Sequence, residues 1–135
     1  MKKKYSLKRN EEIGSIVQKR RFVKNSSFVM YYQQNVNNNF MRVCISVGKK
    51  IGNAVVRNKT KRQVREMVTA LFDFDLNYDL VIIVRNNYLE NDFSSNSEKL
   101  NELYLKLISG LTLQIILSLD LLDSHPNSVD NKLLT

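Results

Sequence analysis

The chain has 135 residues, 43% hydrophobic and 25% charged, which is the composition of one globular domain. A single cysteine, Cys44, excludes an internal disulfide and suits a reducing compartment. The net charge of +8 is unevenly spread: residues 1–65 carry 17 basic and 2 acidic side chains (net +15), and residues 66–135 carry 4 and 11 (net −7). A basic half joined to an acidic half is typical of a protein that presents one surface to nucleic acid.

The first half of the chain predicts a helix followed by two strands. Residues 6–18 form a partial apolar stripe with Ser6 as a plausible N-cap, which predicts a first helix that includes Leu7. Residues 28–33 and 41–47 are strand-like and are separated by an asparagine-rich turn at 35–39. This arrangement predicts an antiparallel hairpin.

A strongly basic helix is predicted after Gly52, with Asn53 as its N-cap. Five cations lie between Arg57 and Arg65. Arg57, Lys61 and Arg65 form one row on the helix surface, and Asn58 and Arg62 form the row beside it. The buried face repeats at three- and four-residue steps and consists of Val56, Thr60, Val64, Met67 and Leu71.

The second half predicts a buried strand and a last helix. The apolar, β-branched run 78–85 is expected to be covered on both faces. Ser94 or Ser95 is expected to open the last helix, whose inward-facing residues are Leu100, Leu103, Leu107 and Tyr104. The apolar tract 111–122 either extends this helix or docks elsewhere, and it is shorter than the ~20 residues of a membrane span. Residues 124–128 break regular structure, and 129–135 are expected to be mobile.

The charges of the basic helix point to a phosphate-binding surface. A solvated helix face usually mixes signs, whereas here the first acidic residue after Lys49 is Glu66. Lys and Arg side chains attract phosphates through charge neutralisation and counterion release, and the guanidinium fork of Arg can grip a phosphate with two hydrogen bonds. The helix is therefore predicted to bind a polyanion.

The segment 47–66, with its Lys-Lys-Ile-Gly-Asn-Ala-Val-Val-Arg-Asn-Lys-Thr-Lys-Arg run, resembles the signature of the bacterial ribonuclease P protein component. The resemblance extends from about Leu7 to about Leu111 and includes the strands at 28–31 and 42–47. We therefore expect a family domain at residues 1–111 and an additional C-terminal extension at 112–135. The fold it implies is an α/β (α+β) two-layer sandwich, in which a four-stranded mixed sheet packs with three helices and the basic helix makes a left-handed βαβ crossover.

The resemblance also implies a function. Proteins of this family assist a catalytic RNA that removes the 5′ leader from precursor tRNA by endonucleolytic hydrolysis. The expected partners are the ribonuclease P RNA subunit and the precursor tRNA leader, and Mg²⁺ is expected to be held mainly by the RNA. No catalytic residue and no metal ligand is expected in the protein. A cytoplasmic location is expected, without membrane or DNA partners.

Site residues follow from the resemblance position by position. The residues expected to contact the RNA subunit are Lys49, Lys50, Asn53, Arg57, Asn58, Lys61, Arg62 and Arg65. Lys59 replaces an Arg of the family pattern, so no specific contact is assigned to it. The residues expected to hold the leader are Tyr31, Ile13, Val17, Lys8 and Arg9, with Lys19, Arg20 and Arg21 as further rim charges. Ile13 and Val17 occupy positions where the family usually has phenylalanine.

Two alternative functions remain open from the residues alone. A structural RNA-binding protein, such as a ribosomal component, would carry a similar basic helix. A metal-dependent nuclease would need a carboxylate cluster, for which Asp73, Asp75 and Asp79 are the only candidates close in sequence. We favour a polar loop at these positions, and we interpret Cys44 as a packing residue and His125 as a surface residue.

Overall fold

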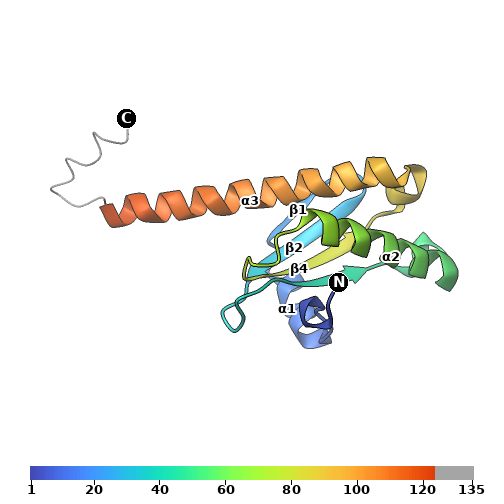
Figure 1. Ribbon diagram of the computed structural model, residues 1–135, viewed down its shortest axis with the longest axis horizontal. Coiled ribbons are helices and arrows are strands. Elements are labelled where there is room, and N and C mark those ends of the chain that lie inside the picture. Colours follow the sequence, from blue (N-terminus) through green and yellow to red (C-terminus); the bar gives the residue numbers. More distant parts are fainter. Residues whose placement is uncertain (124–135) are drawn as a thin grey trace. The chain divides into compact units, whose positions relative to one another are not determined.

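The computed structural model describes residues 1–123 and contains a four-stranded sheet in the order β1-β2-β4-β3 (Figure 1). The elements are α1 (Asn10–Gln18), β1 (Phe22–Lys24), β2 (Phe28–Gln34), β3 (Arg42–Ser46), α2 (Ala54–Leu71), β4 (Tyr78–Val84) and α3 (Phe93–Asp123). Residues Met1–Tyr104 form one compact unit, and a second unit begins at Leu105. The boundary at residue 111 stays a prediction. The predicted tail features at 124–135, including His125, lie outside the described residues.

The sheet is mixed, with β4 at its centre. β4 pairs antiparallel with β2 and parallel with β3, and β1 is antiparallel to β2 at the edge. The predicted four-stranded mixed sheet with three helices is confirmed, but the hairpin between 28–33 and 41–47 is wrong because β4 lies between these strands. Leu80, Val81 and Ile82 are buried on both faces of the sheet, and such a strand is most stable with a neighbour on each side.

The first helix begins later than predicted. Ser6 does not cap it, because Ser6 forms an isolated parallel bridge with Val43, and the Leu7 amide donates to the Val43 carbonyl at 3.0 Å. Leu7 therefore lies in an extended segment beside β3, and α1 starts at Asn10 with no side-chain cap. The cap of α3 is also corrected: the carboxylate of Asp92 accepts from the Ser95 amide at 2.8 Å, so the helix opens after Asp92 rather than at a serine.

Helices cover both faces of the sheet (Figure 1). On one face, α1 places Ile16 against Leu7 and Val81. On the other face lie α2 and the first turns of α3, whose buried residues include Val64, Met67, Leu100 and Leu103. Side chains alternate between the two faces of a strand, so β4 contributes Val81 to the α1 side and its neighbours to the other.

The basic helix α2 has the predicted boundaries and cap. The Asn53 side chain accepts from the Val56 amide at 3.0 Å, which satisfies one of the free donors at the helix start. Thr60, Val64 and Met67 are buried as predicted, together with Val68. Val56 and Leu71 are half-buried. The apolar stripe thus fixes which side of α2 faces water.

The last helix continues through the apolar tract at 111–122, as predicted for an extended helix. By length and composition alone, the helix Phe93–Leu121 could cross a membrane, since its most apolar window has a mean hydropathy of 1.4. The prediction against a membrane span rested on residues 111–122 alone, whereas the helix also includes residues 93–110. Only 17% of that apolar window is buried, so burial of Leu100 and Leu103 in the core accounts for the early turns of α3 and not for its exposed apolar continuation.

Tyr88, which follows β4, predicts a loss of stability at alkaline pH. Its ring is buried against Phe28, its hydroxyl donates to Gln63 at 2.8 Å, and burial raises the pKa of Tyr88 to about 12. An unfolded tyrosine titrates near pH 10, so between about pH 10 and pH 12 only the unfolded chain releases this proton. We expect the free energy of unfolding to fall by roughly 2–3 kcal/mol across that interval. Urea titrations at several pH values should show a flatter profile for Tyr88→Phe.

Candidate nucleic-acid interface

The outward side of α2 carries four cations and one amide that have no side-chain partner within residues 1–123, here called the basic face: Arg57, Asn58, Lys61, Arg62 and Arg65. Asn58, Arg62 and Arg65 are exposed, whereas Arg57 and Lys61 are half-buried. Within residues 1–123, every ion pair involves Glu12 or Asp79, so no carboxylate neutralises this face. The Nε atom of Arg57 is buried and has no hydrogen-bond acceptor in the part of the chain that the structure describes. An unneutralised row of this kind favours binding to a polyanion.

The remaining residues predicted to join this face lie just before α2. Lys49 and Lys50 are exposed in the short 3-10 turn Lys49–Ile51. Gly52 follows with φ of +158°, and a Cβ there would lie 3.0 Å from the Val56 side chain, so the close approach of this loop to α2 needs glycine. Asn53 is exposed, but its side-chain oxygen is used for capping. Only its amide nitrogen is left for a ligand.

Three of the residues predicted to hold the leader, Ile13, Val17 and Tyr31, lie together where α1 packs on the sheet. With Cys44 and Ile83, which the sequence did not single out for this role, they form what is here called the α1-side face. All five are partly buried and pack against Leu7, Ile16 and Val81. Ile13 and Val17 are thus brought together with Tyr31 as predicted, but they also serve the core. Lys8 and Arg9 are exposed in the segment that leads into α1.

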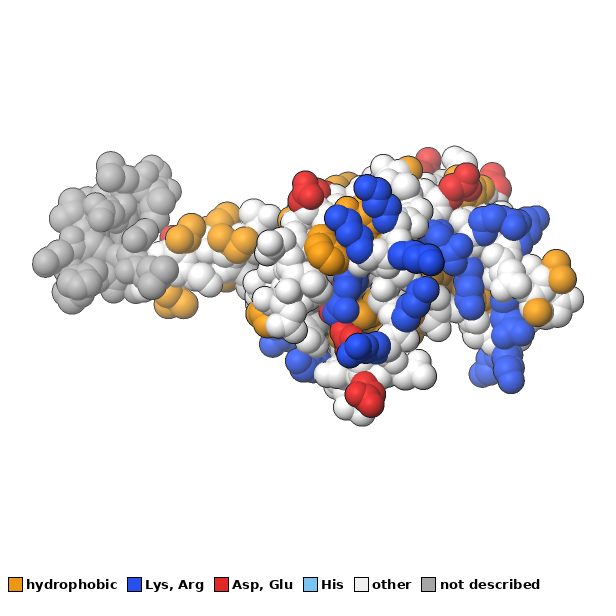
Figure 2. Space-filling view, turned by 60° about the horizontal axis from the view of Figure 1, so that its bottom comes forward, with side chains coloured by type: hydrophobic (Ala, Val, Ile, Leu, Met, Phe, Trp, Pro, Cys, Tyr) orange, Lys and Arg blue, Asp and Glu red, His pale blue; other side chains and the backbone are white. Residues whose placement is uncertain are grey.

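The basic face and the α1-side face adjoin each other. Burial raises the pKa of the Cys44 thiol, and the positive charge of Lys61 on α2 opposes that rise. The geometric basis is that α2 contacts β3, the strand that contributes Cys44 to the α1-side face. Figure 2 shows that Lys and Arg side chains dominate the exposed charge of the compact unit seen from below.

The sequence interpretation missed one aromatic residue on this side of the sheet. Phe22 in β1 pairs in register with Tyr31 in β2, and their ring centroids are 5.3 Å apart. The Phe22 side chain is 39% exposed, and the Lys24 ammonium lies 6.0 Å from its ring centroid. No strand was predicted between the first helix and residues 28–33, so no strand register was available to place Phe22 beside Tyr31.

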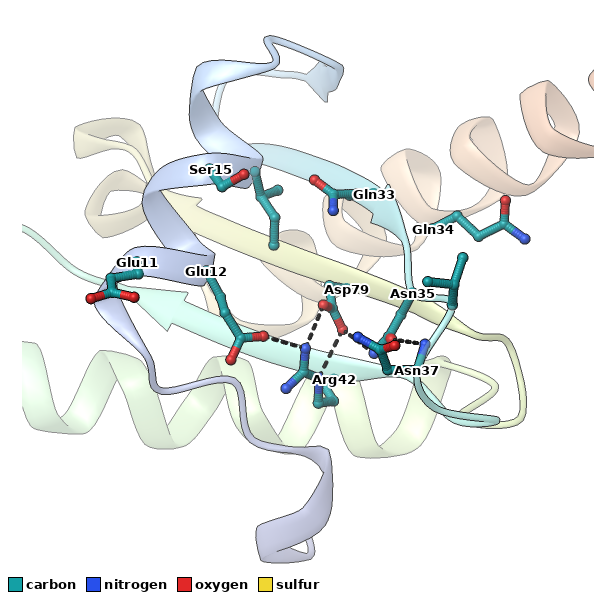
Figure 3. A pocket seen from close by; sticks show the side chains of 11 residues that line it. Glu11, Glu12, Ser15, Gln33, Gln34, Asn35, Asn37, Arg42 and Asp79 are labelled. Carbon is teal, nitrogen blue, oxygen red and sulfur yellow. Dashed lines mark hydrogen bonds and ion pairs between the residues drawn. The ribbon is translucent and has the colours of Figure 1, made fainter.

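A partly buried ion network, with Asp79 as its buried member, joins α1 to the sheet (Figure 3). Arg42 in β3 donates from Nε and Nη2 to the two carboxylate oxygens of Asp79 in β4, at 3.0 and 2.7 Å. Its Nη2 also donates to Glu12 of α1, and Asn35 donates to Asp79 at 3.0 Å. These bonds raise the pKa of Arg42 above its usual value, mainly through the hydrogen bond to Asp79. Because the network joins β3, β4 and α1, its role is to hold α1 in position on the sheet.

The network forms the floor of a pocket of ≈ 300 Å³ between α1 and the end of β2. Glu11, Glu12 and Asp79 line it together with Arg42, so its net charge is negative and it is unsuited to phosphate. The Oε1 atom of Gln33 on its wall is buried without a donor.

The aspartates considered as a nuclease centre are not brought together around one point. Asp79 is buried in the network with Arg42, whereas Asp73 accepts from the backbone amide of Asp75 in the exposed turn after α2. In the part of the chain that the structure describes, no group of three or more His, Cys, Asp or Glu residues is placed to hold a metal ion.

Comparison with known proteins adds a family match. The family model described as Ribonuclease P matches residues 1–108. The chain is 44% identical over 110 residues to the "Ribonuclease P protein component" of Mesoplasma florum, which covers 80% of this chain and 99% of that protein. It is 40% identical over 101 residues to the protein of the same name from Bacillus cereus, which covers 74% of this chain and 88% of that protein.

Solved structures agree with these matches. The RNase P protein of Staphylococcus aureus superimposes with a TM-score of 0.70 at 34% identity and covers 77% of this chain and 94% of that one. The RNase P protein from Thermotoga maritima superimposes with a TM-score of 0.62 at 29% identity. The superposition covers 73% of this chain and 94% of that one. The matched region contains the basic face, the α1-side face and the Arg42 network.

Proposed function

The chain belongs to the bacterial ribonuclease P protein family and is a protein component of ribonuclease P, and we propose from this premise that it binds RNA on two adjoining surfaces. The basic face of α2 would contact the RNA subunit, and the α1-side face would hold the 5′ leader of precursor tRNA. The observation that carries the proposal is the row of unneutralised cations on α2. The family match does not favour the alternative of a ribosomal component.

The chemistry of the basic face supports contact with structured RNA. Arg57, Arg62 and Arg65 offer planar forks that can bind phosphates with two hydrogen bonds, and Asn58 can donate to a phosphate or a sugar hydroxyl. Lys49 and Lys50 would extend the same charge beyond the start of α2.

The α1-side face supports contact with single-stranded RNA. Its half-buried Tyr31 ring offers a stacking surface, and stacking of this kind tolerates any base. Ile13 and Val17 can pack against a sugar or a base edge but have no π face. Lys8 and Arg9 would provide phosphate contacts at the rim.

We assign the hydrolytic chemistry to the RNA subunit, with Mg²⁺ held mainly by that RNA. The protein would contribute by neutralising phosphates, which lowers the repulsion that opposes folding of the RNA and approach of the tRNA. A ribonuclease P role of this kind places no catalytic group on the protein. The proposed location is cytoplasmic, where precursor tRNA is made.

The function is tested by reconstitution. Adding the protein to the matching ribonuclease P RNA at low Mg²⁺ is expected to raise the rate of precursor tRNA cleavage, because protein cations replace part of the metal requirement. Folded protein that gives no increase would reject the proposal. Cleavage by the protein without the RNA subunit would instead favour a protein nuclease.

The two surfaces should separate by mutation. Tyr31→Ala is expected to leave affinity for the RNA subunit unchanged and to weaken binding of precursor tRNA by about 5- to 150-fold, the range of one lost stacking contact. Mature tRNA, which lacks the leader, should bind the mutant holoenzyme as it binds the wild type. Equal losses for both tRNAs would contradict a separate leader surface.

A further inference from the structure

We infer that Phe22 and Tyr31 together form a two-ring platform on which a base of the single-stranded leader stacks. The inference rests on the proposed function, since it names the stacking contact of the leader surface. It assigns a binding role to Phe22, a residue outside the basic helix and outside α1.

The geometry of the two rings supports a shared platform. Phe22 and Tyr31 are cross-strand neighbours on the same side of the sheet, with ring centroids 5.3 Å apart and planes inclined by 51°. The Phe22 side chain is 39% exposed, whereas Tyr31 is half-buried. Tyr31 thus anchors the pair in the α1-side face, and Phe22 extends the aromatic surface toward solvent.

The charge around Phe22 suits a nucleic-acid strand. Lys24 places its ammonium 6.0 Å from the Phe22 ring centroid, and Lys19, Arg20 and Arg21 are all exposed in the connection from α1. Arg20 holds this connection in a left-handed turn with φ of +54°. Aromatic rings interleaved with cations are the pattern by which proteins bind single strands without reading sequence.

Exposure alone would not single out Phe22, because single exposed apolar side chains are normal on protein surfaces. Phe93 provides the contrast: it is 43% exposed at the start of α3, and no ring contact pairs it within residues 1–123. Its neighbour Asp92 and nearby Glu98 are acidic and would repel phosphate. Phe93 is therefore a matched control for Phe22.

The test uses the reconstituted holoenzyme with precursor tRNA, mature tRNA and a series of leaders that each carry one abasic nucleotide. Phe22→Ala is expected to weaken precursor binding by about 5-fold or more, with mature tRNA unaffected and Phe93→Ala without effect. At one leader position, removing the base should weaken wild-type binding similarly. Phe22→Ala should add little to that loss, because the base and the ring form one contact.

Phe22→Leu guards against a trivial effect on folding. Leucine keeps an apolar cover over Tyr31 but lacks a π face, so it should preserve the urea midpoint and still weaken precursor binding. The inference is overturned if Phe22→Leu binds precursor as the wild type does, or if the loss with Phe22→Ala is the same for every abasic position. If the wild-type holoenzyme binds precursor and mature tRNA equally well, the proposed leader surface itself is wrong. This outcome needs no variant, so it is distinct from a failure of the Phe22 inference alone.

Discussion

Arg42→Ala is expected to lower the free energy of unfolding by about 3–5 kcal/mol, the cost of removing one partner from a buried ion pair. The side chains of Arg42 and Asp79 are 21% and 7% exposed, so the Asp79 carboxyl group would lose its main hydrogen-bond donor in a site with little water. Asn35 alone would still donate to that carboxylate. Because small domains are stable by only about 5–15 kcal/mol, the loss should be plain in urea denaturation at neutral pH.

Arg42→Lys is the matched control for this prediction. Lysine keeps a positive charge near Asp79 but cannot make the two parallel hydrogen bonds of the guanidinium, so we expect an intermediate loss. Glu12→Ala removes the link to α1 and leaves the Arg42–Asp79 pair, and its loss should be smaller still. A loss below about 1 kcal/mol for Arg42→Ala would show that the network contributes little.

Removing three cations from the basic face is expected to abolish most of the affinity for the RNA subunit. In the triple variant Arg57→Ala, Lys61→Ala, Arg65→Ala, the slope of log affinity against log salt should fall by about 2–3, since each phosphate contact contributes nearly one unit. Relative to the wild type, binding should be about 100- to 1,000-fold weaker at 0.1 M salt if the affinities converge near 1 M. Filter binding across a salt series measures both quantities.

The control for the triple variant keeps its charge. Arg57→Lys with Arg65→Lys retains every cation and loses only the guanidinium forks, so its salt slope should match the wild type while its affinity falls modestly. An unchanged slope in the triple alanine variant would show that these side chains do not meet phosphates. The triple alanine variant should be at least as stable as the wild type, because it relieves repulsion between neighbouring like charges on the helix, and the Lys variant, which keeps those charges, should be about as stable as the wild type.

The elements predicted best from the sequence are those whose determinants are local. The cap at Asn53 and the stripe of Thr60, Val64 and Met67 lie within one helix, and α2 was predicted with its boundaries. The family resemblance added the four-stranded sheet. Pairing partners were not predictable in this way: the strands at 28–33 and 41–47 were adjacent in sequence, but β4 separates them in the sheet.

Contacts between distant segments account for the other misses. Ser6 is a residue type that favours a helix cap, but its backbone bridges Val43 instead. The Arg42 network joins Arg42 to Glu12 and Asp79, which are 30 and 37 positions away in the sequence. β1 has only three residues, too few for an alternating pattern, so the position of Phe22 beside Tyr31 could be known only from the strand register. Of the candidate site, the basic face was visible in the sequence, whereas the aromatic pair was not.

The central place of β4 has a consequence for synthesis on the ribosome. Among the strands within residues 1–123, β4 is the last to be made, yet it is the only one that pairs with both β2 and β3. Until Val84 has emerged from the exit tunnel, the earlier strands have no common neighbour, and the nascent chain already displays the 17 cations of its first 65 residues. During synthesis the chain is therefore positively charged and lacks a complete sheet while it is close to ribosomal RNA. The sheet can form only after β4 has been made.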